Sequence, residues 1–280
     1  MIALIDGDII VYKAGFAVER KYYTLYIDNE EVKLDERTTK TGIKKYIKDM
    51  GITRDRVRCN SRSEVEDISH AMQIAKTIIQ RAIEETKSTD YKVFITSEDK
   101  SNYRYKIAKT KGYKANRTAG KPHYYKEIRD YLKENWEAEE CFGEEADDRM
   151  GIAQSCDLER GHTIICSIDK DMLMIPGMHY NIDKRTITEV SEFQGYYNFY
   201  KQMLMGDNAD NIPGIDGVGP KTASQILEGC TIVEELENKT KKAYKYYFPG
   251  MTREQLRERF TEVGQLLWIR REDNQMWGML

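Results

Sequence analysis

The sequence predicts an α/β protein in which a mostly parallel sheet, flanked by helices, is followed by a helical C-terminal region. Up to about residue 195, short apolar runs alternate with amphipathic stretches, and strands that alternate with helices form parallel sheets. Beyond that residue the amphipathic stretches continue without apolar runs. We therefore expect an α/β core over residues 1–195 and a helical region over residues 196–280.

Three short apolar runs of the core end in acidic residues, and each run predicts a buried strand. The runs are Met1–Ile5, Tyr91–Thr96 and Thr163–Ile168. The acids that follow them are Asp6 and Asp8, Glu98 and Asp99, and Asp169 and Asp171. Because the ligand sites of open parallel sheets lie at the carboxyl ends of the strands, we expect these acids to gather at one edge of the sheet.

Apolar residues at helical spacing predict helices over residues 67–85 and 144–156 of the core. In the C-terminal region they predict helices over residues 196–205, 220–227 and 253–271. Gly217 and Gly219 separate the first two of these, and Pro220 suits a first helical position, where its missing N–H would be unpaired in any case. This pattern predicts a helix-hairpin-helix.

The composition limits the class of protein. The chain has 280 residues, of which 40% are hydrophobic, and this is enough for a substantial core. It contains no apolar run of about 18 residues that would span a membrane. Five scattered cysteines without a C-x-x-C pair argue against a zinc site or a disulfide framework. We expect a cytoplasmic monomer without a membrane partner.

The net charge of −3 conceals a segregation of charge. Residues 100–133, the basic segment, hold eleven Lys or Arg against two acids, whereas residues 137–148 hold seven acids and no base. Tyrosines lie among these cations, including Tyr103, Tyr105, Tyr113, Tyr124 and Tyr125. A solvated helix face is one explanation. Because cations neutralise phosphates and tyrosine rings stack on bases, the segment also predicts a nucleic-acid partner.

Acids from four separate segments form the main candidate site. They are Asp6, Glu145, Asp147, Asp148, Asp169, Asp171, Asp207 and Asp210. An isolated pair of acids is more often a helix cap, but four pairs at predicted strand ends and helix starts would repel one another unless neutralised. Hard cations such as Mg²⁺ or Mn²⁺ prefer oxygen ligands. Two ions about 4 Å apart would activate a water and stabilise the leaving oxygen of a phosphodiester.

Cations of the basic segment near such a site would bind the scissile phosphate. Arg104 follows a strand-end acid by only a few residues and is the first candidate, and Lys114 and Arg117 are the next. Further DNA contacts are expected from Lys106, Lys109, Lys111 and Tyr113.

At the hairpin, the backbone amides of Gly217 and Gly219 and the start of the following helix form a cluster of donors the size of a phosphate. Lys221 adds charge beside them, and Thr222 adds a hydroxyl. Such a turn contacts phosphates and not bases, so it would hold DNA without sequence preference.

Five motifs, taken in order, resemble the 5′-nuclease superfamily. This superfamily includes flap endonucleases, the 5′-nuclease domain of bacterial DNA polymerase I and stand-alone bacteriophage 5′-3′ exonucleases. The motifs are LIDGD (Leu4–Asp8), YKANR (Tyr113–Arg117), EEADD (Glu144–Asp148), SIDKDM (Ser167–Met172) and GDNADNIPGIDGVGPKTA (Gly206–Ala223). They span nearly the whole chain, and the last is highly specific.

The resemblance implies a resolvase-like (PIN-like) core, a helical arch or clamp over about residues 100–133, and a hairpin that holds duplex DNA. It implies metal binding by the acids already named, with Glu145 beside the others, and K⁺ binding by the carbonyls of Gly217 and Gly219. Where the family ends its second strand with Asp, this chain has Thr96, Ser97, Glu98 and Asp99. Glu98 or Asp99 would fill that position, and we favour Glu98.

We therefore expect a Mg²⁺-dependent 5′-3′ exonuclease or flap endonuclease that uses two ions, accepts Mn²⁺ and cuts DNA from 5′ ends. The resemblance also implies a role in phage replication or recombination inside the host cytoplasm. Whether RNA–DNA hybrids are cut stays open. Two other hypotheses remain: LIDGD is also typical of haloacid-dehalogenase-like phosphatases, in which the first Asp is the nucleophile, and the same fold could serve a non-catalytic DNA-binding protein.

Overall fold

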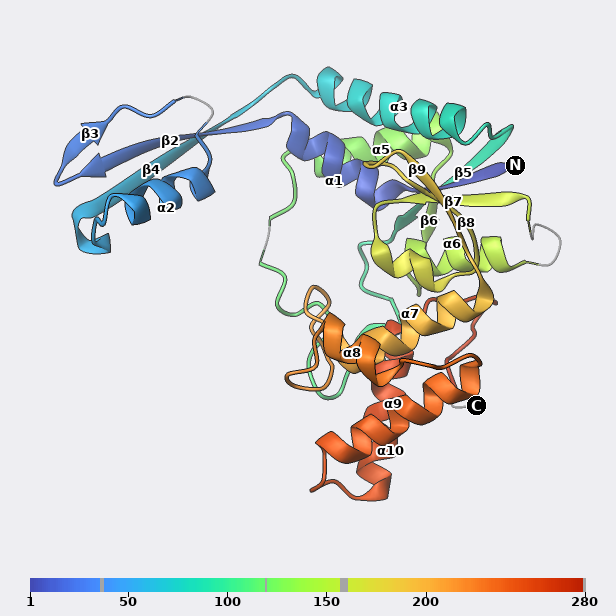
Figure 1. The fold of residues 1–280 in the computed structure, drawn as a ribbon. Helices are drawn as coiled ribbons and strands as arrows, with labels where there is room; N and C mark the ends of the chain where they lie inside the picture. Colours follow the sequence, from blue (N-terminus) through green and yellow to red (C-terminus); the bar gives the residue numbers. More distant parts are fainter. Residues whose placement is uncertain (36–37, 119, 157–160, 279–280) are drawn as a thin grey trace.

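The computed structural model describes residues 1–35, 38–118, 120–156 and 161–278. Its core is a six-stranded sheet in the order β6-β5-β1-β7-β8-β9 (Figure 1). The strands are β1 (Ile2–Asp6), β5 (Asp90–Thr96), β6 (Glu139–Cys141), β7 (Thr163–Ser167), β8 (Gly177–Asn181) and β9 (Thr186–Val190). All neighbours pair in parallel except β9, which is antiparallel to β8. The predicted α/β core with a mostly parallel sheet is confirmed.

Helices cover both faces of this sheet. The helices α1 (Gly7–Ala17), α3 (Ile68–Glu85) and α5 (Tyr125–Trp136) pack on one face, and α6 (Ala146–Ser155) packs on the other. Successive residues of a strand point to opposite faces, so Ala3 and Ile5 belong to the first core and Leu4 to the second. The two predicted core helices match α3 and α6 to within about two residues, which is the usual uncertainty of helix ends.

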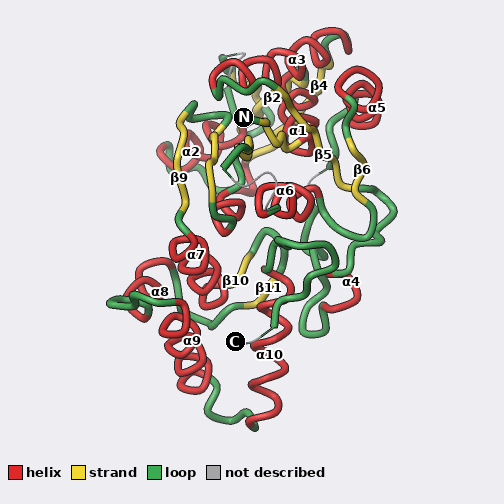
Figure 2. The backbone as a smooth tube through the Cα atoms, turned by 90° about the vertical axis from the view of Figure 1, so that its right-hand side faces the viewer, coloured by secondary structure: helices red, strands yellow, loops and turns green. Residues whose placement is uncertain are grey.

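The C-terminal region is helical, as predicted, and lies below the sheet in Figures 1 and 2. It contains α7 (Glu192–Met205), α8 (Pro220–Ile226), α9 (Val233–Tyr247) and α10 (Arg253–Leu267), with the short strands β10 (Gly206–Asp207) and β11 (Ile212–Pro213) after α7. The helix α7 begins before residue 196 because Ser191 caps it through the amide of Gln194. The prediction of helix up to residue 271 was wrong, because the chain is extended from Trp268. The helix α9 was not predicted.

Residues 19–65 form a module that was also not predicted, and it projects from the core in Figure 1. This β-module is an antiparallel sheet of β2 (Glu19–Ile27), β3 (Glu30–Val32) and β4 (Val57–Val65) with one helix, α2 (Lys40–Asp49), and a 3₁₀ turn at Arg54–Arg56. Its strand β4 carries little hydrophobic signal, since it contains no buried residue. No helix in the described ranges is long and apolar enough to cross a membrane.

The basic segment contains less helix than a helical arch would have. Between β5 and α5 its described part holds the one-turn α4 (Arg104–Ile107) and otherwise loops and turns, and residue 119 lies outside the described residues. The segment is fastened to α10 by Glu262, whose carboxylate accepts hydrogen bonds from the amides of Lys109 (2.6 Å) and Thr110 (2.7 Å) and from the Thr110 hydroxyl (2.6 Å).

Replacing Glu262 by Gln should loosen this attachment. Hydrogen bonds to a charged acceptor are worth about 1.5–3 kcal/mol, and these are exposed, so we expect global stability to change by about 1 kcal/mol or less. Hydrogen exchange of residues 108–111 should accelerate. Glu258→Gln is the matched control, because Glu258 lines the same groove. Equal exchange in both variants would mean that Glu262 does not hold the segment.

Candidate metal centre

The first candidate acid, Asp6, joins the ends of two neighbouring strands. It ends β1 and caps α1 by accepting a hydrogen bond from the amide of Ile9 (3.1 Å). Its other oxygen accepts from the hydroxyl of Ser167 at the end of β7 (2.7 Å). Asp6 is 3% exposed. Burial, with the neighbouring Asp8, raises the pKa of Asp6 to about 7.

Acids from other segments lie close enough to repel one another. Asp147 is in the first turn of α6. Asp169 caps the 3₁₀ helix η2 (Lys170–Met174), which follows β7, and Asp171 lies in that helix. Burial raises the pKa of Asp147, and Asp6 and Asp169 raise it further. Burial, then Asp169 and Asp207, raise the pKa of Asp171 to about 7. Burial also raises the pKa of Asp169. The predicted gathering of acids is therefore visible in their electrostatics.

A divalent cation would suit this set of donors. Every candidate ligand is a carboxylate oxygen, which hard cations prefer, and positive charge would remove the repulsion between the acids. The Oδ1 atom of Asp171 is buried and has no hydrogen-bond partner within the described part of the chain. Across the same ranges, no three His, Cys, Asp or Glu side chains are already grouped closely enough to hold an ion. The chemistry of the donors thus fits a metal, and a bound ion would have to draw them together.

Asp207 and Asp210 belong to the turn between β10 and β11. Asp207 orders this turn by accepting from the amides of Ala209 (2.6 Å) and Asp210 (3.2 Å), and its other oxygen accepts from Gln202 of α7 (3.0 Å). The Asp210 carboxylate accepts from the hydroxyl of Tyr113 (2.8 Å) and from Arg117 (2.5 Å).

Lys114 is the cation placed among these acids. Its ammonium donates to Glu145 (2.5 Å), the residue that caps α6, and lies 3.7 Å from Asp210. Burial alone would raise the pKa of Glu145, but Lys114 and Arg104 outweigh it and lower that pKa to about 2. Asn116 and Asn211 fasten the YKANR segment to the acidic turn through the carbonyls of Asn208 (2.5 Å) and Gly112 (2.9 Å). The structure therefore brings Lys114 and Arg117 to the acids, as predicted.

Arg104 is not available for the predicted phosphate contact. It is 2% exposed, and its guanidinium forms a two-pronged ion pair with Asp148 (2.6 and 2.9 Å). Its remaining donors bond the carbonyls of Leu266 (3.0 Å) and Trp268 (2.6 Å). Asp148, which is fully buried, also accepts from the amides of Arg270 and Glu145. Two predictions are therefore corrected: Arg104 does not face a phosphate, and Asp148 does not face a metal. Their ion pair instead joins α4, α6 and the C-terminal segment.

The acid expected after the second predicted strand, which is β5, also differs from the prediction. Glu98 lies in an exposed turn and pairs with Lys121, and Asp99 accepts from the amide of Ser101 (2.8 Å) in the same turn. The carboxylate at the end of β5 comes instead from Asp8, which accepts from the amide of Thr96 (3.1 Å) and lies 3.3 Å from Arg129. Sequence reasoning missed this role of Asp8 and Arg129, because nothing local shows that the first turn of α1 reaches β5.

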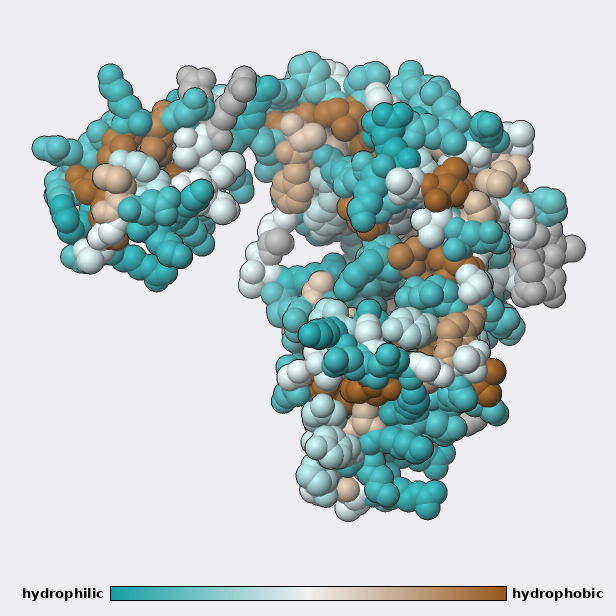
Figure 3. All heavy atoms as spheres, viewed as in Figure 1, coloured by the Kyte–Doolittle hydropathy of each residue, from teal (hydrophilic) through white to brown (hydrophobic). Residues whose placement is uncertain are grey.

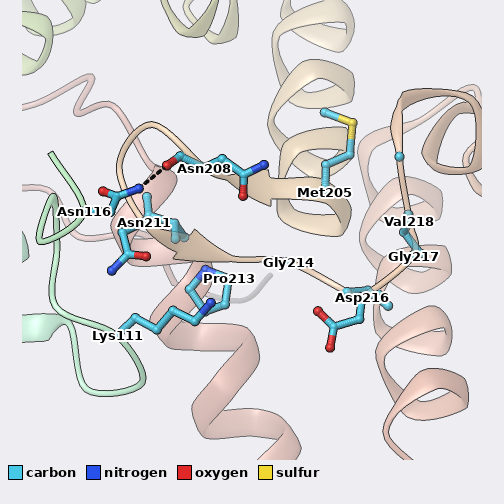
Figure 4. Close-up of a pocket in the computed structure, with 13 residues that line it drawn as sticks. Lys111, Asn116, Met205, Asn208, Asn211, Pro213, Gly214, Asp216, Gly217 and Val218 are labelled. Carbon is cyan, nitrogen blue, oxygen red and sulfur yellow. Dashed lines mark hydrogen bonds between the residues drawn. The ribbon is translucent and has the colours of Figure 1, made fainter. Parts of the chain in front are cut away.

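The hairpin turn borders a pocket, which Figure 4 shows. Gly217 has a φ of 79°, and Gly219 precedes α8 with Pro220 at its first turn. Lys111 approaches the same pocket from the basic segment, and Asn116 donates to the carbonyl of Asn208 across it (Figure 4). Lys221 is exposed on α8, with Thr222 half-buried beside it. Lys106 and Lys109 lie elsewhere, in the groove against α10.

Comparison with known proteins agrees with this arrangement. The family model described as the C-terminal SAM fold of 5′-3′ exonucleases matches residues 199–270. A 5′-3′ exonuclease of Buchnera aphidicola subsp. Schizaphis graminum is 29% identical over 197 residues, which are 65% of this chain and 68% of that protein. DNA polymerase I of Rhizobium leguminosarum is 38% identical over 99 residues, 32% of this chain but 10% of the polymerase.

Solved structures share the fold across almost the whole chain. The bacteriophage T5 D15 flap endonuclease, in a pseudo-enzyme-product complex with DNA and metal ions, has a TM-score of 0.55 at 13% identity and covers 94% of this chain and 88% of its own. The T5 D15 protein crystallised with metal ions has a TM-score of 0.52 at 15% identity, with 95% and 85% covered. The family model, the relatives and the fold agree: this chain is similar to the 5′-3′ exonucleases and flap endonucleases of the 5′-nuclease superfamily.

Proposed function

We propose that this chain is a divalent-metal-dependent 5′-3′ exonuclease and flap endonuclease that hydrolyses DNA from 5′ ends. The observation that carries the metal dependence is the buried Oδ1 of Asp171, which accepts no hydrogen bond from the described residues and lies among acids whose pKa values are raised. The relatives named as 5′-3′ exonucleases, and the T5 structures described with DNA and metal ions, support the same activity.

Two Mg²⁺ ions, or Mn²⁺ in their place, would be held by acids from β1, α6, η2 and the β10–β11 turn. The proposed ligands are Asp6, Glu145, Asp147, Asp169, Asp171, Asp207 and Asp210. Bound metal would supply Lewis-acid stabilisation of the charge that develops on the phosphodiester. Asp148 is left out of this set because its fully buried carboxylate is paired with Arg104, and Glu98 because it lies in an exposed turn and pairs with Lys121.

Lys114 and Arg117 hold Glu145 and Asp210 in the absence of DNA. We propose that Lys114 and Arg117 give up part of their hydrogen bonding to these acids and donate to the scissile phosphate instead. Both side chains are charged donors that already lie beside the acids. Residues 1–195 would carry the catalytic site. Residues 196–280 would hold duplex DNA through the amides of Gly217 and Gly219, with Lys221 and Thr222 beside them and K⁺ at the turn carbonyls.

The experiment that tests this proposal follows 5′-labelled flap, nicked and blunt duplexes with Mg²⁺, with Mn²⁺ and with EDTA. We expect nucleotides or short oligonucleotides with 5′-phosphates, formed only with metal. An RNA–DNA hybrid tests the wider substrate range. Release of inorganic phosphate instead would favour a phosphatase, and tight binding without any cut in Mn²⁺ would favour a non-catalytic DNA-binding protein. The role in phage replication or recombination, in the host cytoplasm and as a monomer, is part of the same proposal.

A further inference from the structure

The β-module carries a lysine-rich helix that the proposed nuclease site does not use. The ten-residue α2 contains four lysines and one acid, Asp49. The lysines are Lys40, Lys44, Lys45 and Lys48, and all are exposed. Within the described ranges none of them forms an ion pair. Unpaired like charges this close repel one another, so the helix keeps an electrostatic penalty that an anionic partner would remove.

This helix is a formed surface and not a loose tail. Thr39 caps it by accepting a hydrogen bond from the amide of Gly42 (3.1 Å), and Ile43 anchors it as its one buried residue. A pocket adjoins its first turn, and its described lining includes Lys21 and Lys40 but no acid. The lysine face of α2 therefore continues into Lys21 of β2.

The opposite face of the β-module is a weaker candidate because its cations are already compensated. Arg58 and Arg62 lie over the rings of Tyr26 and Tyr22, which face them across the strand pair, at 4.5 and 4.9 Å. Arg62 is also 3.5 Å from Glu64. Arg56 pairs with Asp28, and Arg20 lies 2.6 Å from Glu66. Among the described residues of the module, the positive charge that no acid compensates is thus concentrated on α2.

The helix α2 is on the side of the module toward the helical region. In Figures 1 and 2, which differ by a quarter turn, α2 lies below β2 and β4, on the side where α7 and α8 are found. Figure 3 shows the lower edge of the module as mainly hydrophilic. Nucleic acid held at the hairpin turn and leaving the molecule on that side would pass beneath α2.

We propose that the lysine face of α2, with the adjoining pocket, binds the sugar–phosphate backbone of the nucleic acid held at the hairpin. The inference rests on the proposed function for the identity of its partner. It extends the DNA-contacting surface to a module far from the acids, and it predicts binding that depends on salt and is indifferent to base sequence.

The test replaces Lys44, Lys45 and Lys48 together by Gln and measures DNA binding by anisotropy with Ca²⁺ in place of Mg²⁺. Each lost phosphate contact lowers the slope of log K against log salt by about 0.9 on duplex. We expect the slope to fall by roughly 2–3 and affinity at low salt to fall more than about tenfold. A blunt duplex and a duplex with a single-stranded 5′ tail, compared in parallel, show which part of the substrate reaches α2.

Two control variants make the result decisive. The first replaces three exposed lysines of the core, Lys76, Lys87 and Lys184, by Gln and should leave the slope unchanged. The second replaces the α2 lysines by Arg, keeps their charge and should keep the slope. Equal loss in the core variant, or wild-type binding of both substrates by the Gln variant of α2, would overturn the proposal. Because the readout is binding, failure of the chain to cut DNA would leave this test intact.

Discussion

Replacing Asp171 by Asn is expected to lower the rate of cutting by at least about 10³-fold while duplex binding stays close to wild type. The loss corresponds to about 4 kcal/mol of transition-state stabilisation, which is within the several kcal/mol that a metal contributes. Asn offers one neutral oxygen where Asp171 offers a charged, buried oxygen that accepts no hydrogen bond from the described residues. Duplex binding should survive because the hairpin turn and Lys221 lie on separate elements. Single-turnover cutting and anisotropy measure the two effects.

The same variant should be more stable than the wild type when metal is removed. The pKa of Asp171 in the folded protein is about 7, whereas the ordinary value for an aspartate is 3.8. A raised acid pKa means that the wild type loses stability as pH rises from about 4 to about 7, whereas Asn does not titrate. In EDTA at pH 8 we expect Asp171→Asn to gain about 2–4 kcal/mol in unfolding free energy. The gain should shrink toward pH 4.

Urea unfolding in EDTA at pH 5 and pH 8 measures this gain. The combination of lost cutting and increased stability is the signature of an acid that serves a function at the expense of the fold. A variant that cuts normally and unfolds more easily would show instead that Asp171 supports the structure, and the proposed metal centre would lose its main ligand.

The sequence predicted those elements correctly whose structure is determined by neighbouring residues. Apolar periodicity and helix caps depend on neighbouring residues only. They therefore predicted the strands that end at Asp6 and before Asp169, and the helices α3, α6 and α8. The arrival of Lys114 and Arg117 at the acids was predicted because a compact motif, YKANR, carries both. The proximity of Asp6 and Asp169 followed from the rule that parallel strands end at a common edge, whereas Glu98 and Asp99, which the same rule had included, lie in an exposed turn.

The features that the sequence did not predict depend on contacts that are long-range in the chain or largely exposed to solvent. The β-module was missed since β4 has no buried residue to show alternation. Arg104 was assigned to the substrate because its distance from β5 in sequence is short, yet it is committed to Asp148, 44 residues away. The role of Asp8 was missed because its contact with Thr96 spans 88 residues. Pairings of this kind are set by tertiary packing and have no local signature.

The pair of Arg104 and Asp148 leads to the largest expected effect on stability. We expect Asp148→Asn to lose about 3–5 kcal/mol of unfolding free energy, because the change leaves a buried guanidinium without its counter-charge. Asn fits the same space, so packing does not confound the result. Asp273→Asn is the matched control: Asp273 also pairs with an arginine of the α6 region, Arg149 (2.7 Å), but its side chain is 73% exposed. The control should lose about 1 kcal/mol or less.

A double variant separates the charge from the contacts that Asp148 makes with backbone amides. In Asp148→Asn with Arg104→Met no buried charge is left unpaired. The single Asn oxygen keeps only one of the two amide contacts, because the amide of Arg270 donates to Oδ1 of Asp148 and that of Glu145 to Oδ2, so only part of the stability should return. Urea unfolding at pH 7 measures all four proteins. If Asp148→Asn were as stable as the wild type but unable to cut DNA, Asp148 would be a metal ligand, and the structural role drawn from its contacts would be wrong.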